Sequence, residues 1–160
     1  MNAPVLGIEL GSTRIKAVLI GSDFRVLAQG SCRWESVRTG GFWSYSLEDA
    51  ETGLRSCYAA LVRDYRERTG CALTRLSAIG ISAMMHGYLA FDRAGRLLTP
   101  YRTWRNTAAA AAAGELIDLF SFPIPARWSV AHYDFAVRNR EPHVRQTEYL
   151  TTLAGYVHER

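Results

Sequence analysis

The 160-residue sequence lacks the marks of several protein classes. Its three cysteines, Cys32, Cys57 and Cys71, form neither a CxxC pair nor a cluster with histidine, so neither a zinc site nor a disulfide framework is predicted. No apolar run reaches the roughly 20 residues of a membrane helix, and no cationic segment precedes a long apolar stretch at the start. We therefore expect a cytoplasmic protein with reduced thiols and no membrane partner.

Neither positive nor negative charge is concentrated in one part of the sequence. The 19 basic and 15 acidic residues are scattered along the chain and give a net charge of +4. Without a concentrated basic stripe, no nucleic-acid polymer is expected as a partner, whereas small anions such as phosphates are compatible with this balance. The hydrophobic content of 48% suffices to bury one core, so the chain is predicted to be one domain or part of a larger protein.

The first half of the sequence predicts an α/β fold. Apolar or alternating runs at 5–10, 14–20 and 25–32 are separated by short turns and are typical of a three-stranded meander. Apolar residues at helical spacing predict a helix over Leu47–Thr69, and a short apolar run at 76–82 predicts a buried strand after it. The predicted order of elements is βββαβ.

The second half predicts a hairpin followed by helices. Residues 88–98 alternate around an Arg-Ala-Gly turn, which indicates the hairpin. The six alanines at 108–113 predict a solvent-exposed helix with Thr107 as its cap, and Ser129 is expected to cap the next helix. Pro142 lies near a further helix start.

The turn after the first strand carries the first candidate site. Glu9 precedes Gly11-Ser12-Thr13, and Lys16 comes after it. Backbone N–H groups and hydroxyls of such a turn, with a nearby lysine, can hold a phosphate, and the carboxylate can hold Mg²⁺. An equally compatible interpretation is a plain hairpin in which Glu9 and Lys16 pair with each other or face water.

Two segments carry motifs of a known kind. "ELGSTRIK" resembles the first phosphate motif of the superfamily of sugar kinases, hsp70 and actin, in which Asp-x-Gly-Thr precedes a basic residue. "GISAMMHGYLAFDRAGRLLTPYRTWRNT" is similar to a segment with a Met-His-Gly, a hairpin and Trp-x-Asp in the FGGY carbohydrate kinases of that superfamily. The later "FPIPARWSVAHYDFAV" and "YLTTLAGYVHER" extend the resemblance over the whole chain.

The resemblance implies roles for particular residues. Met85 and His86 match a sugar-contacting pair, and Trp104 matches a tryptophan that forms a wall of the sugar site. Glu9 takes the place of the metal-associated carboxylate but is one methylene longer than the usual aspartate. Asn106 stands where many relatives have aspartate, so it brings hydrogen bonds without a negative charge. The phosphate turn consists of Gly11, Ser12, Thr13 and Lys16.

The resemblance also implies a fold, an activity and its cofactors. We expect residues 1–160 to form the N-terminal, ribonuclease H-like domain of an incomplete kinase. The full protein would use ATP and Mg²⁺ to phosphorylate a pentulose such as xylulose or ribulose, and a homodimer is possible when it is full-length. The aspartate base and the adenosine pocket are expected beyond Arg160, so the isolated chain is predicted to be inactive.

Two other classes of function compete with the kinase. A ribonuclease H-like nuclease needs several converging carboxylates for its two metals, whereas the strand at 76–82 ends in Ser82, Ala83 and Met84. The nuclease is therefore disfavoured. A non-enzymatic module that binds sugar or nucleotide, derived from such a kinase, would differ from the kinase only beyond residue 160, and it stays open as an alternative.

Overall fold

The computed structural model describes residues 3–160 and divides into two compact units. Unit 1 consists of the chain up to Glu35 together with Leu47–Ala83. Unit 2 consists of Ser36–Ser46 together with Met84–Arg160. A short segment between the third strand and the long helix, Ser36–Ser46, thus belongs to unit 2.

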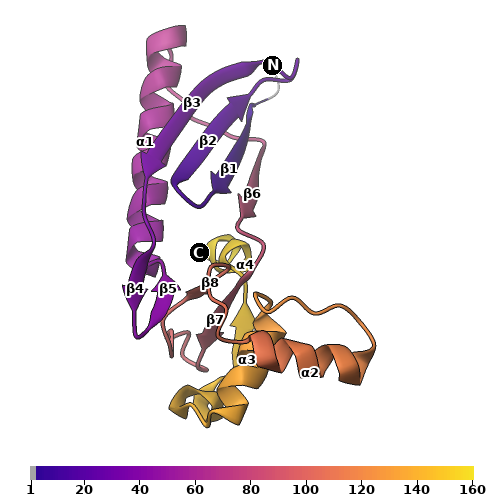
Figure 1. The fold of residues 1–160 in the computed structure, drawn as a ribbon. Coiled ribbons are helices and arrows are strands. Elements are labelled where there is room, and N and C mark those ends of the chain that lie inside the picture. The colour runs from indigo at the N-terminus through magenta and orange to yellow at the C-terminus, as the bar shows by residue number, and fades with distance from the viewer. Residues whose placement is uncertain (1–2) are drawn as a thin grey trace. The chain divides into compact units, whose positions relative to one another are not determined.

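Unit 1 is built on a four-stranded sheet in the order β3-β2-β1-β6 (Figure 1). The first three strands form the predicted antiparallel meander, and the fourth pairs parallel with β1 after the helix. The strands are β1 (Val5–Leu10), β2 (Arg14–Ile20), β3 (Val26–Arg33) and β6 (Ala78–Ala83). The predicted βββαβ order is confirmed.

Helix α1 (Leu47–Thr69) has the predicted bounds and covers one face of this sheet at β3 and β2 (Figure 1). Acidic residues in its first turn and basic residues in its last turn suit the helix dipole. The helix lies very close to β3, because a Cβ on Gly30 would stand 2.2 Å from the carbonyl oxygen of Cys57. Only glycine permits this approach, which lets Leu10, Ile15 and Leu61 become fully buried.

Strand β6 departs from its prediction as a buried strand. Residues Ala78, Ile79 and Gly80 are exposed, and Ile79 retains 57% of its surface. Within residues 3–160, β6 pairs with β1 alone, so its other edge has no strand beside it. The apolar sequence of 76–82 therefore indicated a strand correctly but not its burial.

Unit 2 contains five short strands, of which sequence analysis identified only one. Strand β7 (Gly87–Phe91) is the first arm of the predicted hairpin, and its five residues are all buried. The turn forms as predicted, with Asp92 N–H donating to Arg96 and Gly95 N–H to Asp92, but the second arm makes only one bridge, Phe91 to Leu97. The other strands are β4 (Val37–Thr39), β5 (Phe42–Ser44), β8 (Arg102–Thr103) and β9 (Tyr149–Thr151).

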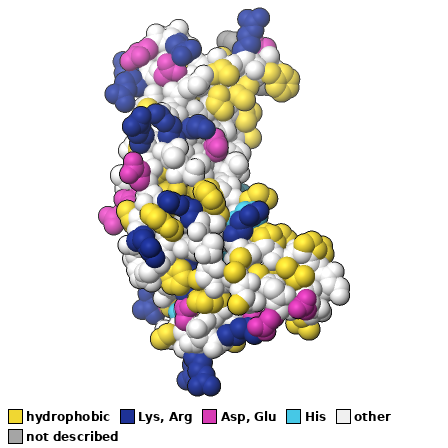
Figure 2. Space-filling view, in the orientation of Figure 1, with side chains coloured by type: hydrophobic (Ala, Val, Ile, Leu, Met, Phe, Trp, Pro, Cys, Tyr) yellow, Lys and Arg dark blue, Asp and Glu magenta, His cyan; other side chains and the backbone are white. Residues whose placement is uncertain are grey.

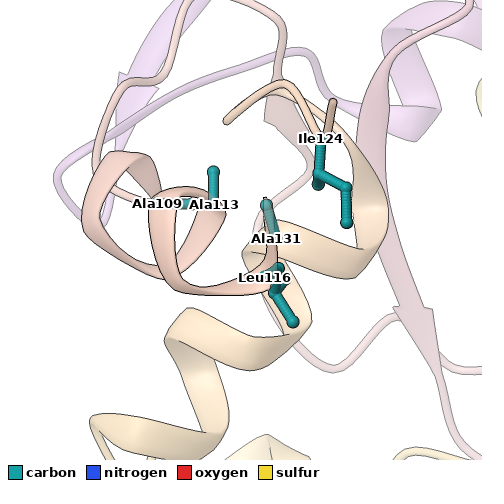
Figure 3. Packing of buried hydrophobic residues seen from close by; sticks show 5 residues of the cluster. All are labelled: Ala109, Ala113, Leu116, Ile124 and Ala131. Carbon is teal, nitrogen blue, oxygen red and sulfur yellow. The ribbon is translucent and has the colours of Figure 1, made fainter. Parts of the chain in front are cut away.

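Helix α3 of unit 2 packs against β7, and it also contacts α2 and η1. A small apolar cluster joins α2 to α3 (Figure 3). This cluster consists of Ala109, Ala113, Leu116, Ile124 and Ala131. The helical elements are α2 (Ala110–Phe120), α3 (Ser129–Arg138), the 3₁₀ helix η1 (Pro142–Gln146) and α4 (Leu153–His158).

Three local predictions for these helices are wrong, and one is confirmed. The residue before α2 is Ala109, without a side-chain cap, so Thr107 does not cap this helix. Ser129 lies inside α3, and its hydroxyl donates to the carbonyl of Gly87 instead of capping. The alanine run is half buried, because α2 packs on α3 through it. Pro142 begins η1 as expected.

The far end of α2 presents apolar side chains outward, and Figure 2 shows hydrophobic surface over this part of unit 2. Leu119, Phe120 and Phe122 are each more than half exposed. Within residues 3–160, none of the helices combines the length and the apolar character needed to cross a membrane.

Candidate functional site

The turn between β1 and β2 is closed by a backbone hydrogen bond and is exposed at its tip. Gly11 N–H donates to the carbonyl of Arg14 at 2.9 Å, while Ser12 and Thr13 are exposed. Glu9 and Lys16 are direct cross-strand partners, and their side chains meet at 3.1 Å. The pair is therefore formed in this structure, as the plain hairpin interpretation expects.

The same pair is accessible to a ligand. The Lys16 and Glu9 side chains retain 56% and 52% of their surface, so solvent weakens their attraction. An incoming phosphate could replace Glu9 as the partner of Lys16 with little loss of folding stability. The exposed pair thus satisfies the hairpin interpretation without excluding the phosphate interpretation.

Trp34 fixes this turn, and sequence analysis did not identify it. Its indole N–H donates to the carbonyl of Gly11 at 2.7 Å, and its backbone N–H donates to the carbonyl of Thr13. The residue is 6% exposed. Trp34 thus donates hydrogen bonds to two carbonyl oxygens of the turn, those of Gly11 and Thr13, which holds the loop in one conformation. A lone tryptophan after a strand gives no sequence signal of such a contact.

The turn can bind Mg²⁺ only if water and a nucleotide supply most of the oxygen ligands. Glu9 is the sole carboxylate of the turn, and residues 3–160 contain no group of three or more side chains able to enclose a metal ion. Mg²⁺ in nucleotide sites is commonly held by one or two carboxylates together with waters and substrate phosphates. Glu9 fits as the single protein ligand of a nucleotide-borne Mg²⁺.

The predicted Met-His pair lies in a pocket of unit 2. Met85 and His86 line it together with Trp128, Ser129 and Val130 from the start of α3. Met85 is 76% exposed, so its side chain is accessible to a ligand in this pocket. The structure thus brings two predicted site residues together with Trp128 and Val130, to which sequence analysis gave no role.

Two contacts hold the backbone of His86 and Gly87 in place. The Ser129 hydroxyl donates to the carbonyl of Gly87 at 2.7 Å, and the buried Tyr101 hydroxyl donates to the carbonyl of His86 at 3.3 Å. A Cβ on Gly87 would stand 2.3 Å from the Tyr101 ring, so only glycine allows this packing. Ser129 and Tyr101 are positioning residues for the Met-His pair.

The environment of His86 favours its neutral form. Partial burial lowers the pKa of His86, and the nearby positive charge of Arg127 lowers it further. A neutral imidazole has one N–H donor and one acceptor nitrogen, so it can serve a sugar hydroxyl in either direction. The imidazole therefore suits hydrogen bonding to a neutral polyol near pH 7.

Trp104 and Asn106 occupy very different surroundings in the turn after β8. Trp104 is 46% exposed, but it does not line the pocket of Met85 and His86. Asn106 is buried, and its amide pairs with the backbone of Trp43: its oxygen accepts from the N–H and its nitrogen donates to the carbonyl, both at 2.8 Å. The same nitrogen donates to the carbonyl of Thr103 at 3.0 Å. The amide nitrogen is thus committed to backbone carbonyls, whereas the amide oxygen accepts one hydrogen bond and retains a second acceptor position.

Beneath β7, unit 2 buries a charged network that the sequence did not predict. The Arg102 guanidinium bonds to Glu141 and lies 4.1 Å from the centre of the Phe42 ring. His143 stands 3.4 Å from the same carboxylate and shares a 2.8 Å hydrogen bond with the Tyr88 hydroxyl. This chain of contacts ties β5, β7, β8 and η1 together.

His132 lies at the edge of this network. It is fully buried, and among residues 3–160 neither of its ring nitrogens has a partner. Burial, together with the charge of Arg102, lowers the pKa of His132 to about 4. His132 is therefore neutral in the folded protein near pH 7.

A comparison with models of protein families identifies the family of this chain. Residues 4–121 match the model of the N-terminal domain of the FGGY family of carbohydrate kinases. The chain belongs to the FGGY family. Its four-stranded sheet with a parallel fourth strand is accordingly that of a ribonuclease H-like domain, as predicted from the motifs. A search among curated proteins finds no significant match.

Solved FGGY-type kinases have the same fold. A xyloylose kinase from Brucella ovis superposes with a TM-score of 0.80 at 21% identity, covering 96% of this chain and 33% of its own. A xylulose kinase from Rhodospirillum rubrum gives 0.79 at 16% identity, with 97% and 33% covered. A gluconate kinase from Lactobacillus acidophilus gives 0.78 at 14% identity, with 94% and 31% covered. The chain thus spans about a third of the length of these relatives.

Proposed function

We propose that residues 1–160 are the N-terminal domain of an ATP-dependent kinase that phosphorylates a hydroxyl of a pentulose such as xylulose or ribulose. The observation that carries this proposal is the pocket in which Met85 and His86 face Trp128, within a chain of the carbohydrate kinase family. Xylulose kinases among the similar structures support the choice of a pentulose over other sugars. The proposal includes a cytoplasmic location and a homodimer for the full-length protein.

In this function the two candidate sites have separate tasks. Lys16 and the backbone N–H groups around Ser12 and Thr13 would bind phosphate oxygens of ATP. Glu9 would hold the Mg²⁺ of the nucleotide, whose charge offsets the charge of the transferring phosphate. The catalytic base that accepts the proton of the sugar hydroxyl would lie beyond Arg160.

On the sugar side, His86 would hydrogen-bond to a hydroxyl and Met85 would pack on carbon atoms of the sugar chain. Trp104 is exposed and can form a further wall of the bound sugar. Asn106 acts best by holding Trp43 and the turn that presents Trp104, because its amide is already bonded to their backbone. This assigns it a positioning role beside the sugar contact implied by the family motif.

The test uses the native gene product that contains residues 1–160 and measures ATP-dependent phosphorylation of a pentulose panel. Lys16→Met should lower kcat/KM about 100-fold, because the positive charge that Lys16 places beside the phosphate is lost. Arg25→Met, another exposed cation of unit 1, should leave kcat/KM unchanged. Failure of the native product to phosphorylate any sugar would overturn the proposal.

The isolated 160-residue polypeptide provides a second test. It should show no steady ADP release with any ketopentose, because one phosphate turn and part of a sugar site do not suffice for transfer. Steady ADP release that Lys16→Ala abolishes would contradict this. Saturable sugar binding without turnover, in the native product as well, would favour the alternative of a binding module.

A further inference from the structure

Unit 2 has a second pocket at the corner where α3 ends and η1 begins. Its volume is about 490 Å³, which is within the range of pockets that hold small molecules. It shares no lining residue with the pocket of Met85 and His86, and the proposed kinase function does not use it. The lining residues are Val137, Arg140, Glu141, Pro142, Val144 and Arg145.

The two arginines of this pocket are not neutralised by the protein. Within residues 3–160, no carboxylate lies within ion-pair distance of Arg140 or Arg145. Both residues are exposed. A guanidinium is a planar fork of N–H donors that matches the oxygens of a phosphate. The pocket therefore offers two uncompensated cations to an anion.

Glu141 is the one carboxylate among the residues that line this pocket, and its charge is already balanced. Its Oε2 atom accepts a hydrogen bond from the buried Arg102 guanidinium and stands 3.4 Å from Nδ1 of His143. The positive charge of Arg102 offsets the negative charge of Glu141 towards an incoming anion. Arg140 and Arg145 thus determine the sign of the potential in the pocket.

Arg140 occupies a backbone position that favours glycine. Its φ is +52°, in the left-handed region. Its N–H donates to the carbonyl of Val137, and the N–H of Glu141 donates to that of Ala136, both at 3.0 Å. This pair of bonds closes a helix around a left-handed residue and involves no side chain. The fold therefore has no need of an arginine here, whereas the pocket obtains one of its two charges from it.

We propose that this pocket binds a phosphate monoester. Arg140 and Arg145 hold the phosphate dianion, and the apolar side chains of Val137, Pro142 and Val144 contact the carbon atoms attached to it. Two guanidinium groups suit a doubly charged phosphate better than a carboxylate, which carries one charge. The proposal goes beyond the proposed kinase function and does not depend on it.

The experiment titrates phenyl phosphate into the native gene product that contains residues 1–160, by isothermal titration calorimetry. Benzoate is the matched ligand, because it carries one negative charge on the same ring. The Kd of phenyl phosphate should be at least about tenfold lower than that of benzoate. Equal Kd values, or no binding of phenyl phosphate, would overturn the proposal.

Variants then locate the binding. Arg145→Met and Arg140→Gly should each raise the Kd of phenyl phosphate at least about tenfold, because charge-assisted hydrogen bonds are lost. Arg140→Gly should do so without lowering the melting temperature, since glycine suits the left-handed backbone. Arg93→Met is the control and should keep the wild-type Kd, because Arg93 is an exposed arginine of the same unit outside this pocket.

The remaining outcomes are decisive as well. If Arg140→Gly lowers the melting temperature, Arg145→Met gives the answer, because it leaves the backbone of the turn unchanged. Wild-type affinity in Arg145→Met, or an equal loss in Arg93→Met, would overturn the proposal. A loss of affinity in Lys16→Met but not in Arg145→Met would place the binding at the β1–β2 turn and would also overturn it. None of these titrations measures sugar phosphorylation, so the proposed kinase function stands or fails separately.

Discussion

The two units use their charged side chains in opposite ways. In unit 1, the interior is apolar and ion pairs such as Lys16 with Glu9 stand in solvent. In unit 2, Arg102 is fully buried between aromatic rings and bonded to Glu141. A solvated pair can exchange its partner for a ligand, whereas a buried charge cannot lose its partner without a large penalty. Unit 1 thus keeps the Lys16–Glu9 pair available, whereas the Arg102–Glu141 pair of unit 2 holds short strands together.

The largest effect is expected where the buried network is cut. Arg102→Met leaves Glu141 without its main partner, so the free energy of unfolding should fall by about 3–5 kcal/mol in urea denaturation. The control is Arg96→Met, which removes an arginine of the same unit whose side chain is 79% exposed, and it should cost less than about 1 kcal/mol.

A double variant sharpens this test of the network. Adding Glu141→Gln to Arg102→Met removes the uncompensated charge and should restore part of the stability. If Arg102→Met and Arg96→Met prove equally mild, the contrast between the units is wrong.

The second effect concerns pH. The pKa of His132 is about 4 in the folded protein against 6.5 in the unfolded chain, so between these values the unfolded state binds more protons. Stability is therefore complete above about pH 6.5 and should fall by about 3 kcal/mol as the pH drops towards 4. His143, whose pKa burial also lowers, adds to the same trend.

The variant that isolates His132 is His132→Leu, because neither ring nitrogen has a partner to lose among residues 3–160. Its free energy of unfolding, measured from pH 4 to 8, should depend on pH much less than that of the wild type. His158→Leu, at the end of α4, is the control and should keep the wild-type slope. An unchanged slope in His132→Leu would show that other groups cause the acid sensitivity.

A third, intermediate effect is expected at Asn106. Asn106→Asp keeps an acceptor for Trp43 N–H but loses the donor to the carbonyls of Trp43 and Thr103 and places a carboxylate beside them. We expect a loss of about 1–3 kcal/mol in stability at pH 7. Asn139→Asp, at the exposed end of α3, should cost less. Wild-type stability in Asn106→Asp would mean that its buried hydrogen bonds are readily exchanged. Direct contact with the sugar would then be its main proposed role.

The smallest effect is expected in unit 1. Lys16→Met and Glu9→Gln each break an ion pair between half-exposed side chains, so the free energy of unfolding should change by less than about 0.5 kcal/mol. The same Lys16→Met is expected to reduce kinase activity strongly. A loss of several kcal/mol in stability would instead show that the pair serves the hairpin, and the phosphate interpretation would lose its support.

Local sequence signals predicted unit 1 well. The bounds of β1, β2 and α1 agree with alternation and helical spacing, because each of these elements has one face towards the sheet core. The same signals failed at β6, since an apolar run does not reveal whether a neighbouring strand or helix covers it.

Unit 2 was harder to predict for a physical reason. Its strands β4, β5, β8 and β9 have only two or three residues each, too few to show a period. They are held by distant contacts, such as the Trp43 backbone with Asn106, 63 residues later. Trp128 likewise meets Met85 and His86 only through the fold, and nothing in its own neighbourhood of the sequence indicates a pocket.

The sequence by itself determined the family, the meander with its Gly-Ser-Thr turn, the long helix and the position of the Met-His pair, because these depend on local periodicity and on short motifs. Only the tertiary structure decided which polar side chains are buried, since the contacts of Arg102, His132 and Asn106 join segments far apart in the chain. Burial and partnership are properties of the folded chain. They fixed the Asn106 amide against the backbone of Trp43 and placed Trp128 beside Met85 and His86.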